Sequence, residues 1–439
     1  MSNDIDIPAR TVAAEPEWFG QPRGLSILFL TEMWTTFSFF GMRALLVLYA
    51  TKQLHFGQQT VSWIYGIYAA GVYLTPIFGG IVTDRWLGPR LSVLIGGSIM
   101  AIGHFMMGLE SLFFFALATI ALGNGLFLPG LPSQIDSLYA HDDPRRKSAY
   151  NIYYVGINIG AFASPIVVGT VGELYGFHWG FSIAGFGMLV AIVTYVLGGR
   201  YLPSDRSRAS PVTRARRDAP QSRPEGLMKR FGLLFAIAAV VVIFRGAYEQ
   251  IGNTMALWAD ANIDRSVTST LSIPVTWFQS LNSMVVILLS PVLVAHWTRL
   301  AKLHRDRSSV AKMAIGAAVI GFSYLAIAGA AHWADGHSEK LSWIWLAGFV
   351  TVMTAGELYI LPVGLGLFGR LAPAGFTATT IAIWFSAGFL GNLWAGWLGT
   401  LWTPLSHGIF FAVIGAVALF AAVLLLLLVS RARLREAGV

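Results

Sequence analysis

Twelve apolar runs, each about as long as a membrane is thick, constrain this chain more than any other feature of its 439 residues. A helix needs about 20 predominantly apolar residues to cross the ~30 Å hydrocarbon core of a bilayer. The runs are continuous and do not alternate with a period of two, so they predict helices rather than barrel strands. The predicted spans are residues 25–50, 61–83, 91–109, 112–133, 148–171, 181–197, 231–258, 273–296, 311–331, 344–368, 377–401 and 409–429.

The charge content agrees with this interpretation. Only 12% of the residues are charged and 55% are hydrophobic, whereas a soluble domain carries about a quarter of its residues as Asp, Glu, Lys and Arg. The first 24 residues are polar and show no apolar signal-peptide core. We therefore predict an all-α integral membrane protein with twelve transmembrane helices.

Lys and Arg predict the orientation of these helices. If the N-terminus is cytoplasmic, the basic residues gather in cytoplasmic loops and in the tail, as the positive-inside rule requires. This loop bias also explains the net charge of +8 without nucleic acid. The cytoplasmic set includes Arg85, Arg90, Arg145, Arg146, Lys147, Arg299, Lys302, Arg305, Arg307, Lys312, Arg370, Arg431, Arg433 and Arg435, whereas the opposite loops hold Lys52, Arg265 and Lys340.

A polar segment divides the helices six and six. Residues 199–230 are rich in Arg and contain Pro, so they predict a flexible cytoplasmic linker. Transporters are often built from two such halves, and GNGLFLPGL and ELYILPVGLG are a faint trace of an internal repeat. We expect a cytoplasmic segment 1–24, a six-helix bundle 25–198, the linker 199–230, a second six-helix bundle 231–430 and a cytoplasmic tail 431–439, with a central cavity between the bundles.

The chain is poor in residues suited to covalent or metal chemistry. It contains no Cys, and its nine His are scattered singly, so neither a disulfide nor a metal site is predicted. No nucleophile–base pair and no Gly-rich phosphate loop appears. We expect no enzymatic activity, no metal and no cofactor.

Five ionisable residues fall inside the predicted spans, where charge is costly and usually functional. Arg245 and Glu249 are four residues apart, so they can pair on one helix face. Glu357 has no basic neighbour within two turns, and Glu32 and Arg43 are separated by about 16 Å of helix. A buried carboxylate is readily neutralised by a proton, so each Glu is a candidate proton carrier. A buried ion pair or a neutral Glu that only aids packing is the structural alternative.

Several segments resemble, in order along residues 24–396, the motifs of the proton-dependent oligopeptide transporter (POT) family. The segment GGIVTDRWLGPR resembles the loop motif of the wider major facilitator superfamily. The more specific matches are FSFFGMRALLVLY, SLYAHDDPRRKSAYNIYYVGINIGAF, AYEQIGNTMALWAD, WFQSLNSMVVILLSP, GELYILPVGLGLFGRLAP and IWFSAGFLGN. The resemblance implies the major facilitator fold and proton-driven uptake of di- and tripeptides.

The resemblance also implies a substrate site. Asn158, Asn282 and Glu357 match family positions that hold the peptide's amino terminus, and amide and carboxylate oxygens suit an ammonium group. Tyr68 and Tyr73 fall where family tyrosines face the cavity. Trp384 matches a tryptophan that lines a side-chain pocket, and ordinary helix packing is the alternative for all three aromatic residues.

Arg43 and Glu249 match a family pair that closes the extracellular side. Protonation of the acid would break such a pair and loosen the gate.

The first helix departs from the family pattern. The family signature there is a Glu, two residues, then Glu-Arg-Phe, and this chain keeps Glu32 and Phe37 but has Thr35 and Thr36 between them. The following tyrosine pair is Phe39 and Phe40, and the family lysine of helix four is Leu128. In the family the missing residues form one network that couples protons and receives the peptide carboxylate. The absence of all three charged residues together, the second Glu, the Arg and the Lys, is electrostatically coherent. Removal of one partner alone would leave a buried charge unpaired.

Two hypotheses follow from these departures. The substrate is an amine-bearing or peptide-like compound whose carboxylate is blocked, distant or absent, unless Arg245 supplies a relocated cation. Proton coupling runs through Glu249, Glu357 or Glu32. We predict a monomeric secondary active transporter of the inner membrane that imports peptides or peptide-like compounds by alternating access. A proton-independent facilitator, an exporter of amine-bearing metabolites or antibiotics, and a transport-dead receptor are the alternatives.

Overall fold

A computed structural model describes residues 17–139, 143–203, 227–269, 271–337, 339–373 and 376–436. Within these ranges, twelve helices are long and apolar enough to cross a membrane, and each overlaps one predicted span. The prediction of a twelve-helix membrane protein is confirmed. Most of the predicted linker and of the N-terminal segment lies outside the described residues.

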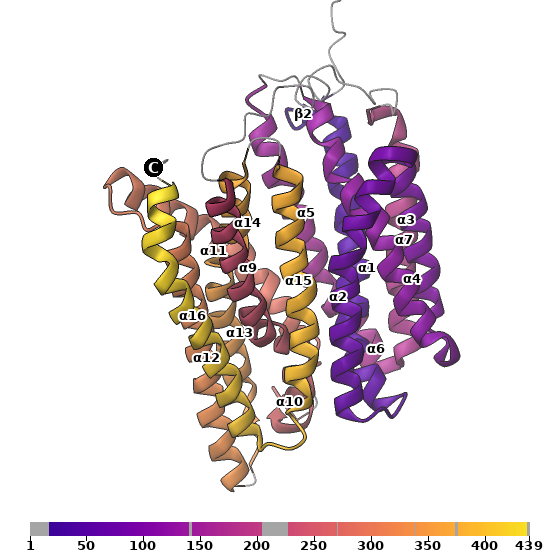
Figure 1. Ribbon diagram of the computed structural model, residues 1–439. Helices are drawn as coiled ribbons and strands as arrows, with labels where there is room; N and C mark the ends of the chain where they lie inside the picture. Colours follow the sequence, from indigo (N-terminus) through magenta and orange to yellow (C-terminus); the bar gives the residue numbers. More distant parts are fainter. Residues whose placement is uncertain are drawn as a thin grey trace, which may run out of the picture.

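The N-terminal half forms one bundle, in which α1 packs against the helices that follow α4 and α3 packs against α4. Figure 1 shows it as the indigo and magenta part of the molecule. Its elements are β1 (Glu17–Trp18), β2 (Gln21–Pro22), α1 (Arg23–Lys52), α2 (Gln58–Val82), the π-helix η1 (Thr83–Leu87), α3 (Pro89–Met106), η2 (Glu110–Leu112), α4 (Phe113–Gly130), η3 (Pro132–Gln134), η4 (Asp136–Leu138), α5 (Arg146–Ser164), the π-helix η5 (Pro165–Gly169), α6 (Thr170–Tyr175), α7 (Phe177–Leu197) and η6 (Gly198–Tyr201).

The C-terminal half forms the second bundle, drawn from crimson to yellow in Figure 1, with α12 against α16 as its largest helix contact. The described ends of the chain lie at the same end of the molecule. Its elements are α9 (Leu227–Tyr248), η8 (Glu249–Gly252), α10 (Thr254–Asn262), β3 (Ile263–Asp264), α11 (Trp277–Lys302), α12 (Ser309–His337), β4 (Leu341–Ser342), α13 (Trp343–Leu358), α14 (Leu361–Leu371), α15 (Thr377–Thr400) and α16 (His407–Glu436).

Three predicted spans are interrupted: 148–171 by the π-helix η5, and two others beside a carboxylate. The predicted span 231–258 breaks after Tyr248, where Glu249 begins the short 3₁₀ segment η8. The predicted span 344–368 breaks at Tyr359 and Ile360, directly after α13, and the last turn of α13 holds Glu357. Pro362 opens α14 there, since a proline lacks the N–H that a continuing helix would use but fits the first turn of a new one. Interrupted helices at the middle of a membrane are typical of transporter binding sites.

The two bundles are joined at the end of the molecule opposite the described chain ends. There Gln58 donates a hydrogen bond to the Gly399 carbonyl (3.0 Å) and Asn253 donates one to Ser62 (3.1 Å). The side chain of Glu173 accepts hydrogen bonds from the backbone and hydroxyl of Thr276. These contacts close the interface at this end, which we call the closed end.

Close packing of α2 on α15 at the closed end depends on glycine. A Cβ added at Gly66 would lie 2.7 Å from the Gly396 Cα, so the helices approach at a distance that only glycine permits.

We expect Gly66→Leu to open this end. A bulky side chain in a tight contact costs roughly 1–3 kcal/mol, which would reduce the population of the closed end by about one to two orders of magnitude. Because the chain has no Cys, spin labels at cysteines introduced for His55 and Pro404 can measure the opening. Gly329→Leu is the control, since nothing lies within 4 Å of a Cβ there. Equal distance distributions in both variants would contradict the prediction.

Candidate functional site

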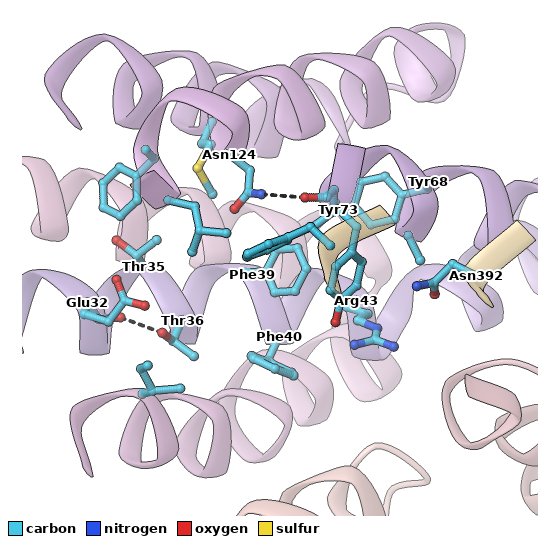
Figure 2. A pocket seen from close by; sticks show the side chains of 17 residues that line it. Glu32, Thr35, Thr36, Phe39, Phe40, Arg43, Tyr68, Tyr73, Asn124 and Asn392 are labelled. Carbon is cyan, nitrogen blue, oxygen red and sulfur yellow. Dashed lines mark hydrogen bonds between the residues drawn. The ribbon is translucent and has the colours of Figure 1, made fainter. Parts of the chain in front are cut away.

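A cavity of about 270 Å³ is enclosed mainly by helices of the N-terminal bundle, and α15 of the C-terminal bundle borders it through Phe385 and Asn392; its wall is mostly apolar and aromatic. Glu32 and Arg43 are the only side chains of Asp, Glu, Lys or Arg among the residues that line it. Figure 2 shows Glu32 at the left and Arg43 right of the centre, with Phe39 and Phe40 between them. The lining comprises Glu32, Thr35, Thr36, Phe39, Phe40, Arg43, Tyr68, Ala69, Val72, Tyr73, Met100, Asn124, Phe127, Leu128, Ile157, Phe385 and Asn392.

The positions where this chain departs from the family pattern meet in this cavity. Thr35, Thr36 and Leu128 line it together with Glu32, which is 7% exposed. Both threonine hydroxyls donate to backbone carbonyls four residues earlier, at 2.9 and 2.7 Å. They are therefore satisfied within α1, and they bring no charge to the Glu32 carboxylate.

Arg43 and Glu249 form an ion pair between the two bundles, deep in the protein. A guanidinium nitrogen of Arg43 lies 2.5 Å from Oε2 of Glu249, whose side chain is 3% exposed. The Tyr65 hydroxyl accepts a hydrogen bond from Arg43 and lies 3.3 Å from the same carboxylate oxygen. The structure thus joins the two residues that sequence assigns to a gate. Their action as a gate stays a prediction.

Arg245 makes this pair a group of three. Its guanidinium lies 2.9 Å from Oε1 of Glu249, as the i,i+4 spacing predicts, and its side chain is 5% exposed. The same guanidinium lies over the ring of Tyr73, 4.5 Å from its centroid, where the negative face of the ring attracts a cation. One carboxylate therefore faces two arginines. The sequence predicted each of the two pairs separately, but not that Glu249 contacts both arginines at once.

A second polar group contains the residues assigned to the substrate amine. Asn282 on α11 donates hydrogen bonds to the Glu357 carboxylate (2.7 Å) and to the Thr354 hydroxyl (2.9 Å) on α13. Asn158, on α5 of the other bundle, donates to the Tyr154 carbonyl (2.9 Å). The side chain of Tyr154 interacts with both Asn158 and Glu357, so it links the two sides.

Two tyrosines of this site were missed by sequence reasoning. Tyr154 lies four residues before Asn158, a spacing that places both on one helix face, and this was the available signal. Tyr248 reaches the Glu357 carboxylate and also lies within electrostatic range of Glu249 and Arg245. It therefore connects the two polar groups, and nothing in its local sequence marks it.

The three predicted aromatic residues lie in different surroundings. Tyr68 and Tyr73 line the cavity, and the Tyr68 hydroxyl is buried without a hydrogen-bond partner in the structure. Trp384 packs edge-to-face on Phe368 at 5.1 Å and is 7% exposed, inside the C-terminal bundle. The next residue, Phe385, is the one that lines the cavity. In the described residues no group of three or more His, Asp or Glu side chains is placed to hold a metal ion.

Comparisons with known proteins agree on one family. A family model described as the POT family (PTR2) matches residues 90–222 and 225–413. A di-/tripeptide transporter of Lactococcus lactis subsp. cremoris is 31% identical over 94% of this chain and 96% of its own length. A crystal structure of a peptide transporter POT in complex with sulfate has a TM-score of 0.86 at 29% identity, covering 96% of this chain and 97% of the other. A POT family transporter in complex with a thioalcohol conjugated peptide has a TM-score of 0.83 at 25% identity, covering 94% and 97%.

Proposed function

Because this chain belongs to the POT family, we propose that it moves peptides or peptide-like compounds across the inner membrane by alternating access. Members of this family are transporters and not enzymes, and the chain is a multi-pass membrane protein of the major facilitator fold.

The observation that carries the proposal is the polar group around Glu357. The Glu357 carboxylate accepts a hydrogen bond from the Asn282 carboxamide and interacts with the side chains of Tyr248 and Tyr154. Tyr154 also hydrogen-bonds Asn158, on α5, which packs against α11. Carboxylate and amide oxygens are good acceptors for the three N–H donors of an ammonium group. One relative is named as a di-/tripeptide transporter and one related structure is in complex with a conjugated peptide, which supports a peptide as the ligand.

The arrangement of the bundles supports alternating access. The interface is sealed at the closed end by side-chain hydrogen bonds and by the Gly66–Gly396 approach. The Arg43–Glu249 pair lies between this seal and the cavity. We propose that the closed end is extracellular, that both chain termini are cytoplasmic, and that the two bundles rock about the central site.

We further propose that the transporter imports its substrate together with protons. Glu249, Glu357 and Glu32 are the buried carboxylates available to carry them. Glu249 is suited to coupling because its neutralisation would remove the attraction that holds Arg43 across the interface.

Uptake into proteoliposomes tests the proposed function. A pH difference of about one unit, acidic outside, supplies ~1.4 kcal/mol per proton, enough for up to about tenfold accumulation of a dipeptide with one proton. We expect accumulation that an ionophore abolishes and that Glu249→Gln removes. Glu110→Gln, an exposed carboxylate bonded to Gln53, is the matched control. Equal uptake with and without the gradient would instead indicate a facilitator.

A further inference from the structure

One end of the cavity holds a carboxylate that has no cation beside it. Glu32 lines the cavity from α1 and is 7% exposed. In the part of the chain that the structure describes, no ion pair includes Glu32. Its carboxylate interacts with the side chain of Tyr153, which is a neutral phenol. Because a buried, unpaired charge is costly, this carboxylate needs either a proton or a cation from outside the protein.

The one cation in the cavity wall cannot supply that charge. Arg43 lies eleven residues after Glu32 on the same helix, which separates them by ~16 Å. Its guanidinium is also engaged elsewhere, since it lies 2.5 Å from Oε2 of Glu249. Figure 2 shows the side chains of Phe39 and Phe40 between the two charged groups. Glu32 therefore faces the cavity without compensation from Arg43.

The polar residues next to Glu32 do not compensate it either. The Thr35 and Thr36 hydroxyls donate to the backbone carbonyls of Thr31 and Glu32, at 2.9 and 2.7 Å. A hydroxyl has a single O–H donor, so neither threonine has a second one for the carboxylate. Leu128, which lines the same cavity, is apolar. The carboxylate is thus left available to a ligand.

The rest of the wall suits an aliphatic chain that ends in a cation. Phe39, Phe40, Phe127 and Met100 line the cavity, and the rings of Phe39 and Phe40 meet edge to face at 5.4 Å. Apolar surface of this kind covers the methylene stem of a basic side chain, and the faces of aromatic rings attract cations. A water molecule occupies about 30 Å³ in the liquid, so a cavity of about 270 Å³ has room for several heavy atoms.

We propose that Glu32 is the receptor for a cationic side chain of the substrate, with the stem of that side chain packed against Phe39 and Phe40. The inference rests on the proposed function and specifies its substrate class: peptides or peptide-like compounds that carry a basic side chain. The cation of the ligand would take the place of the proton that otherwise neutralises Glu32. The amino terminus of the same ligand is recognised separately, by the polar group around Glu357.

Competition binding with matched pairs of dipeptides tests the inference on the purified full-length protein. The side chains of lysine and norleucine share a four-carbon stem and differ by the ammonium group. Alanyl-lysine is therefore compared with alanyl-norleucine, and lysyl-alanine with norleucyl-alanine. In at least one of the two pairs, we expect the wild type to bind the lysine peptide about tenfold more tightly, a difference of ~1.4 kcal/mol.

Four variants locate the origin of this preference. Glu32→Gln keeps the shape of the side chain without its charge, so the affinity ratio should fall toward one, while the norleucine peptide keeps its affinity within about twofold. Thr36→Arg places a guanidinium four residues after Glu32, where it can pair with the carboxylate, and should also abolish the preference. Glu357→Gln should weaken both peptides of a pair alike, because both carry an amino terminus. Glu110→Gln, at an exposed site, is the matched control and should leave both affinities unchanged.

The ratio separates recognition of the cation from damage to the fold, since damage would weaken both peptides of a pair alike. Equal affinities within both pairs in the wild type would overturn the inference, as would a preference for lysine that survives in Glu32→Gln. If Thr36→Arg does not fold, the wild type and Glu32→Gln still decide. Binding of the norleucine peptides without preference for lysine rejects only the inference, whereas binding of none of the peptides rejects the proposed function and the inference with it.

Discussion

Replacement of Glu249 by Gln is expected to destabilise the protein by roughly 3–5 kcal/mol, the usual cost of removing one partner from a buried ion pair. The cost is large here because two guanidiniums lose their common partner. Arg245 is nearly inaccessible at 5% side-chain exposure, so it cannot turn toward water. Thermal and denaturant-induced unfolding in detergent would measure the loss.

A second substitution shows whether the lost stability belongs to the group of three. In Glu249→Gln combined with Arg245→Leu, only Arg43 remains, beside Tyr65 and the cavity, and we expect more than half of the lost stability to return. Glu110→Gln, at an exposed site, is the control and should change the stability by less than about 0.5 kcal/mol. A double variant as unstable as Glu249→Gln alone would contradict the explanation.

Replacement of Glu357 by Gln is expected to weaken binding of a dipeptide by about 10- to 150-fold, because a hydrogen bond between charged groups contributes roughly 1.5–3 kcal/mol. The overall fold should persist, since the Gln side chain has the same shape and its carbonyl can still accept the hydrogen bond from Asn282. Titration calorimetry of the purified protein, with unfolding measured in parallel, separates the loss of affinity from any loss of stability.

An N-acetylated dipeptide isolates the role of the ammonium group. This compound has no amino-terminal charge, so we expect it to bind the wild type weakly and to lose less than about twofold in Glu357→Gln, as for other interactions removed from both partners. A loss that is equally large for both peptides would show that Glu357 does not recognise the amine.

The substitutions at Thr35, Thr36 and Leu128 acquire a spatial meaning in the structure. Thr35 and Thr36 lie beside Glu32 at one end of the cavity (Figure 2), and Leu128 lines the same cavity. Both threonines direct their hydroxyls back to the backbone of α1. This end has no cation, and the additional arginine of this chain, Arg245, lies over the ring of Tyr73 outside the lining of the cavity.

The sequence alone was enough to predict an all-α membrane protein, its twelve membrane helices and the few ionisable residues inside them. These properties follow from run length, from apolar content and from the cost of charge in a bilayer, all of which are local. The i,i+4 pair of Arg245 and Glu249 was also predictable, because a continuous helix fixes which side chains are neighbours.

Which of these buried residues contact one another could be learned only from the three-dimensional packing of the helices. The pairing of Arg43 with Glu249 joins two residues that are 206 positions apart in the sequence. The interaction of Tyr154 with both Asn158 and Glu357 likewise depends on packing between the two bundles. The helix breaks beside Glu249 and Glu357 were not predicted either. Hydropathy indicates how long an apolar segment is, but not whether its helix is continuous. Local sequence specifies which polar groups are buried, whereas packing between the two bundles specifies which of them come into contact. The proposed site consists of residues that this packing brings together.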